Sequence, residues 1–170
     1  QQRREILKQR DPLAAVDARA GDVFVGLDLQ PRLVIAHRDV YRQLRQRGVR
    51  VEFVVYDLLP ILMPNNFMQG AEELHAKWLG VVAENDGAIC ISRAVADELR
   101  TWVQSDLRAG RVASNFSIRW FHLGVDPLPP STPPAGVTDS KLQAAMAGRP
   151  TFLMVGTIEP RKGHALVLEA

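Results

Sequence analysis

Short hydrophobic runs alternate with amphipathic segments along most of the chain. Five runs are predicted to be strands, because they are largely apolar and bounded by turn-forming residues: 23–27, 51–56, 88–91, 118–123 and 151–155. Apolar residues recur at helical spacing in 39–47, 71–85 and 92–103, and in shorter patterns at 140–147 and 165–170. Strands that alternate with helices at this pitch indicate an α/β fold with a doubly wound, Rossmann-like parallel sheet.

A proline-rich stretch interrupts this alternation. Residues 127–136 hold five of the eleven prolines, which is typical of a linker. We therefore predict an N-terminal domain over 1–126, a linker over 127–150 and, from 151 to 170, the first strand, loop and helix of a second Rossmann-like domain. Both domains are expected to be incomplete, because the chain opens on Gln1 instead of Met and stops inside a helical pattern.

Composition narrows the function classes. The 21 Lys and Arg residues nearly balance the 19 Asp and Glu residues, so net charge gives no argument for a nucleic-acid partner and none is expected. The single cysteine, Cys90, lies in an apolar run and is predicted to be a buried thiol. The four histidines lack metal-ligand spacing, so no metal site is predicted. No apolar stretch approaches the ~20 residues that cross a bilayer, and a reducing, cytoplasmic compartment is the default expectation.

The strongest candidate site is the loop 156–164, which lies between a predicted strand and a predicted helix. Such a turn can direct backbone N–H groups and the helix dipole at an anion, while Arg161 and Lys162 add two positive charges. The alternative is a solvated turn with exposed basic residues, and the loop matches neither the dinucleotide-binding nor the P-loop motif.

A second candidate, Asp57, follows the predicted strand 51–56. Ligands of open parallel sheets bind outside the carboxyl ends of the strands, so an aspartate there can accept a hydrogen bond from a sugar hydroxyl or orient a reacting group. Asp before a proline-containing loop is also an ordinary turn-former. The segment 124–126, Gly-Val-Asp, favours a bend between domains.

Several of these motifs together resemble one family. Residues 152–164, FLMVGTIEPRKGH, are similar to the first strand and loop of the donor domain in family-4 retaining glycosyltransferases. In the expected order, 53–60 (FVVYDLLP) resembles the acceptor-domain strand and loop that face the cleft, 91–95 (ISRAV) the Ser-capped helix start, and 124–126 the hinge. The resemblance spans roughly residues 22–170.

This resemblance implies a two-domain enzyme of the GT-B type. The acceptor would bind to the first Rossmann-like domain and the nucleotide sugar to the second, with retention of anomeric configuration and without an obligatory metal or other cofactor. Family members that share the motifs YDLLP (56–60) and TIEPRK (157–162) look like bacterial mannosyltransferases of surface-polysaccharide assembly. The resemblance therefore makes GDP-mannose the candidate donor and a glycan or lipid-linked oligosaccharide the candidate acceptor. The chain by itself is expected to be inactive.

The resemblance also assigns residue roles. Lys162 falls on the family's donor-phosphate lysine, with Arg161 beside it and Gly156 and Thr157 at the start of the same loop. Many family members have Arg at the position of Thr157, so the phosphate contact is expected to rely on Arg161. Asp57 is the candidate catalytic residue. Many members have His immediately before it, and here that residue is Tyr56.

Two other functional interpretations are weighed against the glycosyltransferase, and the role of one charged surface is left open. A non-catalytic Rossmann-like binding module is the alternative from another class, and a dinucleotide-dependent oxidoreductase is disfavoured because no GxGxxG follows a strand. Arg38, Arg42 and Arg45 lie along one face of a predicted helix, with Arg3, Arg4 and Lys8 adding charge, which would suit peripheral contact with an anionic membrane. A merely solvated face is the alternative.

Overall fold

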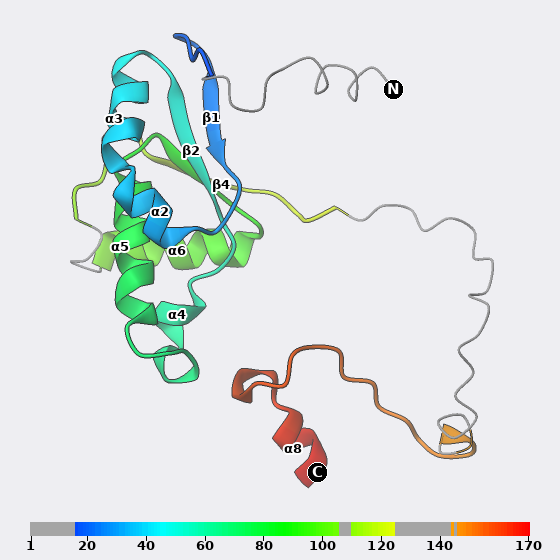
Figure 1. Ribbon diagram of the computed structural model, residues 1–170. Coiled ribbons are helices and arrows are strands. Elements are labelled where there is room, and N and C mark those ends of the chain that lie inside the picture. Colours follow the sequence, from blue (N-terminus) through cyan, green and yellow to red (C-terminus); the bar gives the residue numbers. More distant parts are fainter. Residues whose placement is uncertain (1–15, 106–109, 125–143, 145) are drawn as a thin grey trace, which may run out of the picture. The chain divides into compact units, whose positions relative to one another are not determined.

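The computed structural model describes residues 16–105, 110–124, 144 and 146–170 (Figure 1). The chain divides into two compact units, Gln1–Leu123 and Gly124–Ala170. Most of the predicted linker, including Val125 and Asp126, and the basic residues Arg3, Arg4 and Lys8 lie outside the described residues.

The first unit is built on a four-stranded sheet in which every pair of neighbours is parallel. Its strands are β1 (Val23–Gly26), β2 (Arg50–Val55), β3 (Gly87–Cys90) and β4 (Ser117–Trp120), in the order β1-β2-β3-β4. Helices connect them: α2 (Pro31–Ala36), α3 (Arg38–Gln46), α4 (Leu59–Leu62), the short η1 (Pro64–Asn66), α5 (Ala71–Ala83) and α6 (Arg93–Ser105). The predicted α/β class with a Rossmann-like parallel sheet is confirmed.

Local sequence signals explain where these helices begin and end. Pro31 opens α2 at a position where its missing N–H costs nothing. Gly48, with φ of +81°, follows the end of α3. Ser92 Oγ accepts a hydrogen bond from the Val95 N–H at 3.2 Å, so the N-cap predicted for α6 is formed.

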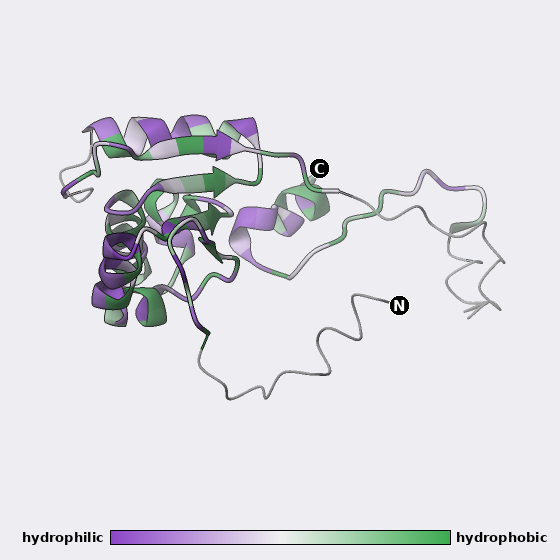
Figure 2. Ribbon diagram, turned by 90° about the horizontal axis from the view of Figure 1, so that it is seen from above, coloured by the Kyte–Doolittle hydropathy of each residue, from purple (hydrophilic) through white to green (hydrophobic). Residues whose placement is uncertain are grey.

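The described helices cover one face of the sheet. The strand order follows the chain without a reversal, and right-handed crossovers then place successive helices on the same side. The side chains that enter the helix-packed core alternate along the strands: Phe24, Val51, Phe53, Val55, Ala88, Cys90 and Ile118. The strands are largely hydrophobic, whereas the helices mix hydrophobic and hydrophilic residues, as expected for helices with one buried face (Figure 2).

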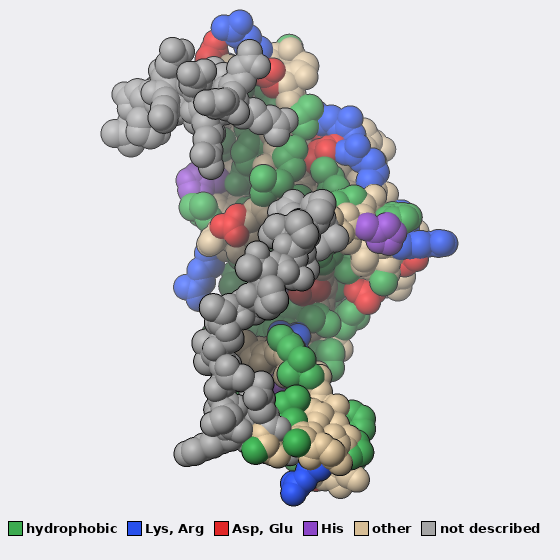
Figure 3. Space-filling model, turned by 90° about the vertical axis from the view of Figure 1, so that its right-hand side faces the viewer, with side chains coloured by type: hydrophobic (Ala, Val, Ile, Leu, Met, Phe, Trp, Pro, Cys, Tyr) green, Lys and Arg blue, Asp and Glu red, His purple; other side chains and the backbone are tan. Residues whose placement is uncertain are grey.

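The intervening strand residues face the other side. Val23 and Val25 of β1 are 55% and 37% exposed, and hydrophobic side chains lie at the surface among charged ones in a view from the side away from α2 and α3 (Figure 3). Glu52 is 3% exposed on this face and pairs with both Arg50 and Arg119. Gly87 is its register partner on β3, and a Cβ there would lie 2.9 Å from the backbone oxygen of Ser117.

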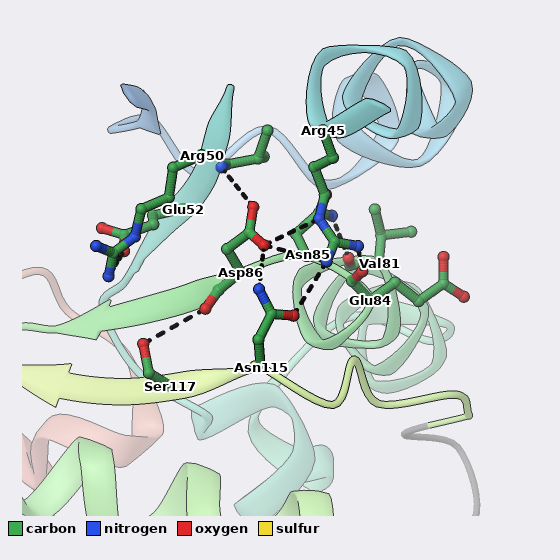
Figure 4. A network of polar contacts seen from close by, with 10 residues as sticks. Arg45, Arg50, Glu52, Val81, Glu84, Asn85, Asp86, Asn115 and Ser117 are labelled. Carbon is green, nitrogen blue, oxygen red and sulfur yellow. Dashed lines mark hydrogen bonds and ion pairs between the residues drawn. The ribbon is translucent and has the colours of Figure 1, made fainter. Parts of the chain in front are cut away.

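A polar network closes the amino-terminal edge of the sheet, immediately before β3 (Figure 4). Asp86 Oδ2 accepts a hydrogen bond from the Val51 N–H at 2.8 Å, and its Oδ1 accepts from Arg45 and from the Asn115 amide. Arg45 also donates to the backbone oxygen of Glu84 at 2.6 Å. The network therefore joins α3, the end of α5 and the starts of β2 and β4.

Cys90 lies fully buried at the end of β3, as predicted. Burial raises the pKa of its thiol to about 11, although the charge of Arg100 acts in the opposite direction. No helix among the described residues is long and apolar enough to span a membrane.

The second unit contains little regular structure among its described residues. A short 3-10 turn, η3 (Pro160–Lys162), leads through Gly163 into α8 (His164–Glu169). The strand predicted over 151–155 is not formed, because a strand needs a hydrogen-bonded neighbour and this segment has none among the described residues. Its apolar side chains are accordingly exposed, Phe152 to 85% and Val155 to 87%.

Candidate functional site

Asp57 lies directly beyond the carboxyl end of β2, where the sequence placed it. Its Oδ1 accepts a hydrogen bond from the Leu59 N–H at 3.1 Å, which turns the chain from the strand into α4. The residue is half-buried. The turn-forming role and a functional role are therefore compatible, because this bond occupies one carboxylate oxygen and leaves lone pairs on both.

A buried histidine fixes the backbone of Asp57. His75 of α5 is 4% exposed, and its Nε2 lies 3.0 Å from the backbone oxygen of Asp57, to which it donates when Nε2 carries the proton. The ring packs edge-on against Trp78, with 5.0 Å between centroids. Burial lowers the pKa of His75, so the neutral ring is favoured near pH 7.

A second carboxylate approaches from α6. Glu98 is half-buried, and its pKa is raised first by burial and then by the negative charge of Asp57. Within the described part of the chain, Glu98 has no hydrogen-bond or ion-pair partner. The carboxyl group of Glu98 is therefore near enough to that of Asp57 to feel its charge, and both groups can accept hydrogen bonds from hydroxyl groups of a ligand.

Sequence reasoning missed His75 and Glu98. Both lie inside helices whose apolar periodicity was read only as packing. The available signal was a polar residue beside an apolar stripe, as Glu98 is beside Leu99 and Trp102. The signal did not identify a partner, because Asp57 is 41 positions earlier in the sequence and the sheet topology alone brings the two together.

Tyr56 has a structural contact at this edge. Its hydroxyl donates to the backbone oxygen of Leu27 at 2.8 Å and so ties the segments that follow β1 and β2. The side chain is 37% exposed. Tyr56 thus supports the loop by a contact to the main chain.

In the second unit the loop residues form their own set of contacts. Arg161 donates from Nε and Nη2 to the two carboxylate oxygens of Glu159, at 2.8 and 2.9 Å, and the Thr157 hydroxyl donates to the same carboxylate. These hydrogen bonds, Thr157's first, lower the pKa of Glu159. Half of the loop's positive charge is therefore balanced internally.

Lys162 is the exposed cation of this loop. Its aliphatic stem lies beside Gly156, where an added Cβ would be 3.7 Å from Lys162 Cδ. Lys162 makes no ion pair with any described residue. Gly163 adopts φ of +71° and turns the chain into α8. The loop thus brings Gly156 and Lys162 together and leaves the Lys162 ammonium group without an ion-pair partner among the described residues.

The arginine row of α3 is engaged within the first unit. Arg38 pairs with Glu84, Arg42 with Asp39, and Arg45 with Asp86. Arg38 and Arg42 keep about half of their side chains exposed, 50% and 56%, and Arg45 keeps 29%. No group of three or more His, Cys, Asp or Glu side chains in the described ranges could hold a metal ion.

Comparison with known proteins finds relatives of this chain by sequence. Over 152 residues and 88% of its length, the chain is 37% identical to two Escherichia coli proteins, each described as serotype-specific mannosyltransferase WbdA. The expected similarity to glycosyltransferases is confirmed. A third WbdA from E. coli is 36% identical over 155 residues, again 88% of this chain.

The similarity to WbdA concerns only part of that protein, because the chain spans 18% of the length of each of these relatives. No family model matches the chain. No solved structure matches it either. The similarity to WbdA therefore rests on sequence identity alone. The parallel sheet, and Asp57 at its carboxyl edge, are separate observations made on the structure.

Proposed function

We propose that a protein carrying this sequence is a retaining glycosyltransferase of surface-polysaccharide biosynthesis. It would transfer a hexosyl group, with mannosyl from GDP-mannose as the specific proposal, to a glycan or lipid-linked acceptor. The observation that carries the proposal is identity of 37% over 88% of the chain to proteins described as mannosyltransferases. A non-catalytic Rossmann-like module is the alternative.

Each segment has a place in this proposal. Residues 1–126 would form part of the acceptor-binding domain, 127–150 the linker, and 151–170 the start of the nucleotide-sugar domain. Asp57, at the carboxyl end of a parallel strand, would orient the acceptor hydroxyl by accepting its hydrogen bond. No metal or further cofactor is part of the proposal.

The loop 156–162 would bind the donor phosphates. As the bond between the anomeric carbon and the nucleoside diphosphate breaks, negative charge grows on the terminal phosphate oxygens, and a nearby cation stabilises this transition state more than the ground state. Lys162 would supply that charge. Arg161 would contribute only by exchanging Glu159 for phosphate, while Gly156 and Thr157 would line the start of the loop.

Steady-state kinetics of the full-length protein that carries this sequence test the proposal. Lys162→Ala should lower kcat/KM for the nucleotide sugar by about 10- to 100-fold, because a charge-assisted hydrogen bond contributes about 1.5–3 kcal/mol. Asp57→Asn should lower kcat with an unchanged donor KM. Lys77→Ala, an exposed lysine of α5, is the control. Absence of sugar transfer would favour the non-catalytic module. Sugar transfer that neither variant alters would remove Lys162 and Asp57 from their proposed roles.

Peripheral contact with the inner face of the membrane is a finer proposal. Arg38, Arg42 and Arg45 carry it, but each already has an acidic partner in the structure, which lowers the net charge they offer to a lipid surface. Co-sedimentation with anionic and neutral vesicles decides the matter. Binding that ignores lipid charge, or that survives reversal of the Arg38 and Arg42 charges, would leave a solvated helical face. Together with this membrane contact, we propose that the protein is located in the cytoplasm.

A further inference from the structure

An open hollow of about 680 Å³ lies between α4 and α6, on the helix-covered side of the first unit. Leu62 of α4 and Ala94, Glu98, Thr101 and Trp102 of α6 are among the residues that line it. Asp97 and Ser105 complete the lining, so carboxylate and hydroxyl oxygens lie beside the apolar surfaces of Leu62, Ala94 and Trp102. Such a mixture suits a small ligand that is itself both polar and apolar.

Glu98 connects this hollow to the end of β2. It is one of the lining residues, and its carboxyl group is close enough to Asp57 for the charge of Asp57 to affect it. Its neighbour Asp97 is already paired with Arg93 and Arg100, whereas Glu98 has no such partner among the described residues. A half-buried carboxylate without a partner retains all of its capacity to accept hydrogen bonds.

The hollows at the opposite edge of the sheet differ in this respect. One of about 540 Å³ is lined by Arg45, Asp86 and Asn115, whose polar atoms already bond to one another. A ligand there would have to break existing hydrogen bonds. A ligand beside Glu98 would instead donate hydrogen bonds to a carboxylate that accepts none from the described residues.

We propose that the hollow between α4 and α6 is a saccharide subsite, in which Glu98 accepts hydrogen bonds from hydroxyl groups of the acceptor glycan while Asp57 holds the reacting hydroxyl. This inference rests on the proposed transferase function. A sugar presents hydroxyl donors on its rim and C–H groups on its faces, and these match the carboxylate of Glu98 and the apolar surfaces of Leu62 and Ala94 respectively.

Binding of α-linked mannobiose to the 170-residue chain tests the subsite without any nucleotide sugar. The readout is the indole N–H signal of Trp102 in ¹⁵N-labelled protein, assigned by substitution among the three tryptophans. Mannobiose should shift this signal. Glu98→Gln preserves shape but removes the charge, and should weaken binding about five- to tenfold. Glu73→Gln on α5, an exposed glutamate paired with Lys77, is the matched control and should bind as the unaltered chain does.

A second variant separates loss of the site from loss of the fold. Ala94 is exposed and lines the hollow, so Ala94→Trp should block mannobiose binding while the other amide signals stay dispersed. An unshifted Trp102 signal in the unaltered chain, or equal affinity in Glu98→Gln and Glu73→Gln, would overturn the subsite. In the full-length protein, Glu98→Gln should raise the acceptor KM and leave the donor KM unchanged. Sugar transfer in which both KM values are unaffected would overturn the subsite while leaving the transferase proposal intact.

Discussion

Arg45 on α3 donates from Nε to Asp86 Oδ1 over 3.1 Å, and so ties a helix to the residue that precedes β3 (Figure 4). Asp86 also holds the first N–H of the buried part of β2 and the side chain of Asn115. The carboxylate of Asp86 therefore fixes the amino-terminal ends of β2, β3 and β4. Asp57 follows the opposite end of β2, so the polar groups at the two edges of this sheet are separated by the apolar core of the first unit.

Removal of the Asp86 carboxylate should destabilise the first unit. Asp86→Ala leaves the Val51 N–H without its acceptor and removes the carboxylate partner of Arg45, and we expect a loss of about 2–3 kcal/mol in the free energy of unfolding. Asp39→Ala, which removes only an exposed ion pair with Arg42, should cost less than about 1 kcal/mol. Urea denaturation followed by tryptophan fluorescence measures both. Equal losses of unfolding free energy in Asp86→Ala and Asp39→Ala would show that Asp86 has no special part in stabilising the first unit.

The contribution of Asp86 should depend on pH in the acid range. Burial alone would raise the pKa of this carboxyl, but the hydrogen bonds from Val51 and Asn115 and the charge of Arg45 outweigh it and lower the pKa. The stabilisation is then fully present above the unfolded pKa of about 3.9 and is lost as the pH falls through the lower folded pKa. The difference in urea midpoint between the unaltered chain and Asp86→Ala should thus shrink below about pH 4. A constant difference down to pH 2 contradicts this.

The thiol of Cys90 should be unreactive in the folded chain. With a pKa of about 11, only about one molecule in a thousand carries the thiolate at pH 8, and the side chain is buried as well. Ellman's reagent should therefore label the native chain slowly and the urea-unfolded chain completely within the dead time of mixing. Rapid stoichiometric labelling of the native chain would show that the end of β3 is open to solvent.

A methyl group at Gly87 should disturb the packing of β3 against β4. An added Cβ would lie 2.9 Å from both the backbone oxygen and the Oγ of Ser117, and 3.4 Å from Glu52 Oε1. Gly87→Ala should cost about 1–3 kcal/mol, as expected when atoms are forced into a well-packed interior. Gly124→Ala has open space around its Cβ and should be nearly neutral. Thermal unfolding of the two variants compares them, and similar midpoints would refute the steric argument.

Much of the first unit could be predicted because its elements carry local signals. The buried strand β2 is nearly all apolar apart from Arg50 and Glu52, and the Ser92 cap and Gly48 mark helix boundaries that the structure reproduces. The segment 151–155 has an equally apolar pattern but forms no strand among the described residues, because a strand depends on a hydrogen-bonded neighbour that its own sequence does not supply.

The candidate site could be predicted only in part. Asp57 was found because its position after a strand is visible in the sequence, and the structure places it beyond the end of β2. Its role as a reacting group stays a prediction. His75 and Glu98 could not be found in this way, because their relation to Asp57 arises from the packing of α5 and α6 over the sheet. In the same way, the pairing of Arg161 with Glu159 changes the charge that the loop offers, which a count of basic residues did not reveal.

The uninterrupted strand order has a consequence for assembly of the sheet during synthesis. Each of β2, β3 and β4 pairs with a strand that leaves the ribosome before it, so none of these described strands has to wait for a partner still to be translated. The segment that closes at each step is one crossover, which contains α2 and α3, then α4, η1 and α5, and finally α6. Such short connections keep the entropic cost of each addition small. The growing edge therefore advances with translation, from β1 through β4, and each newly made strand covers the edge that was exposed before it.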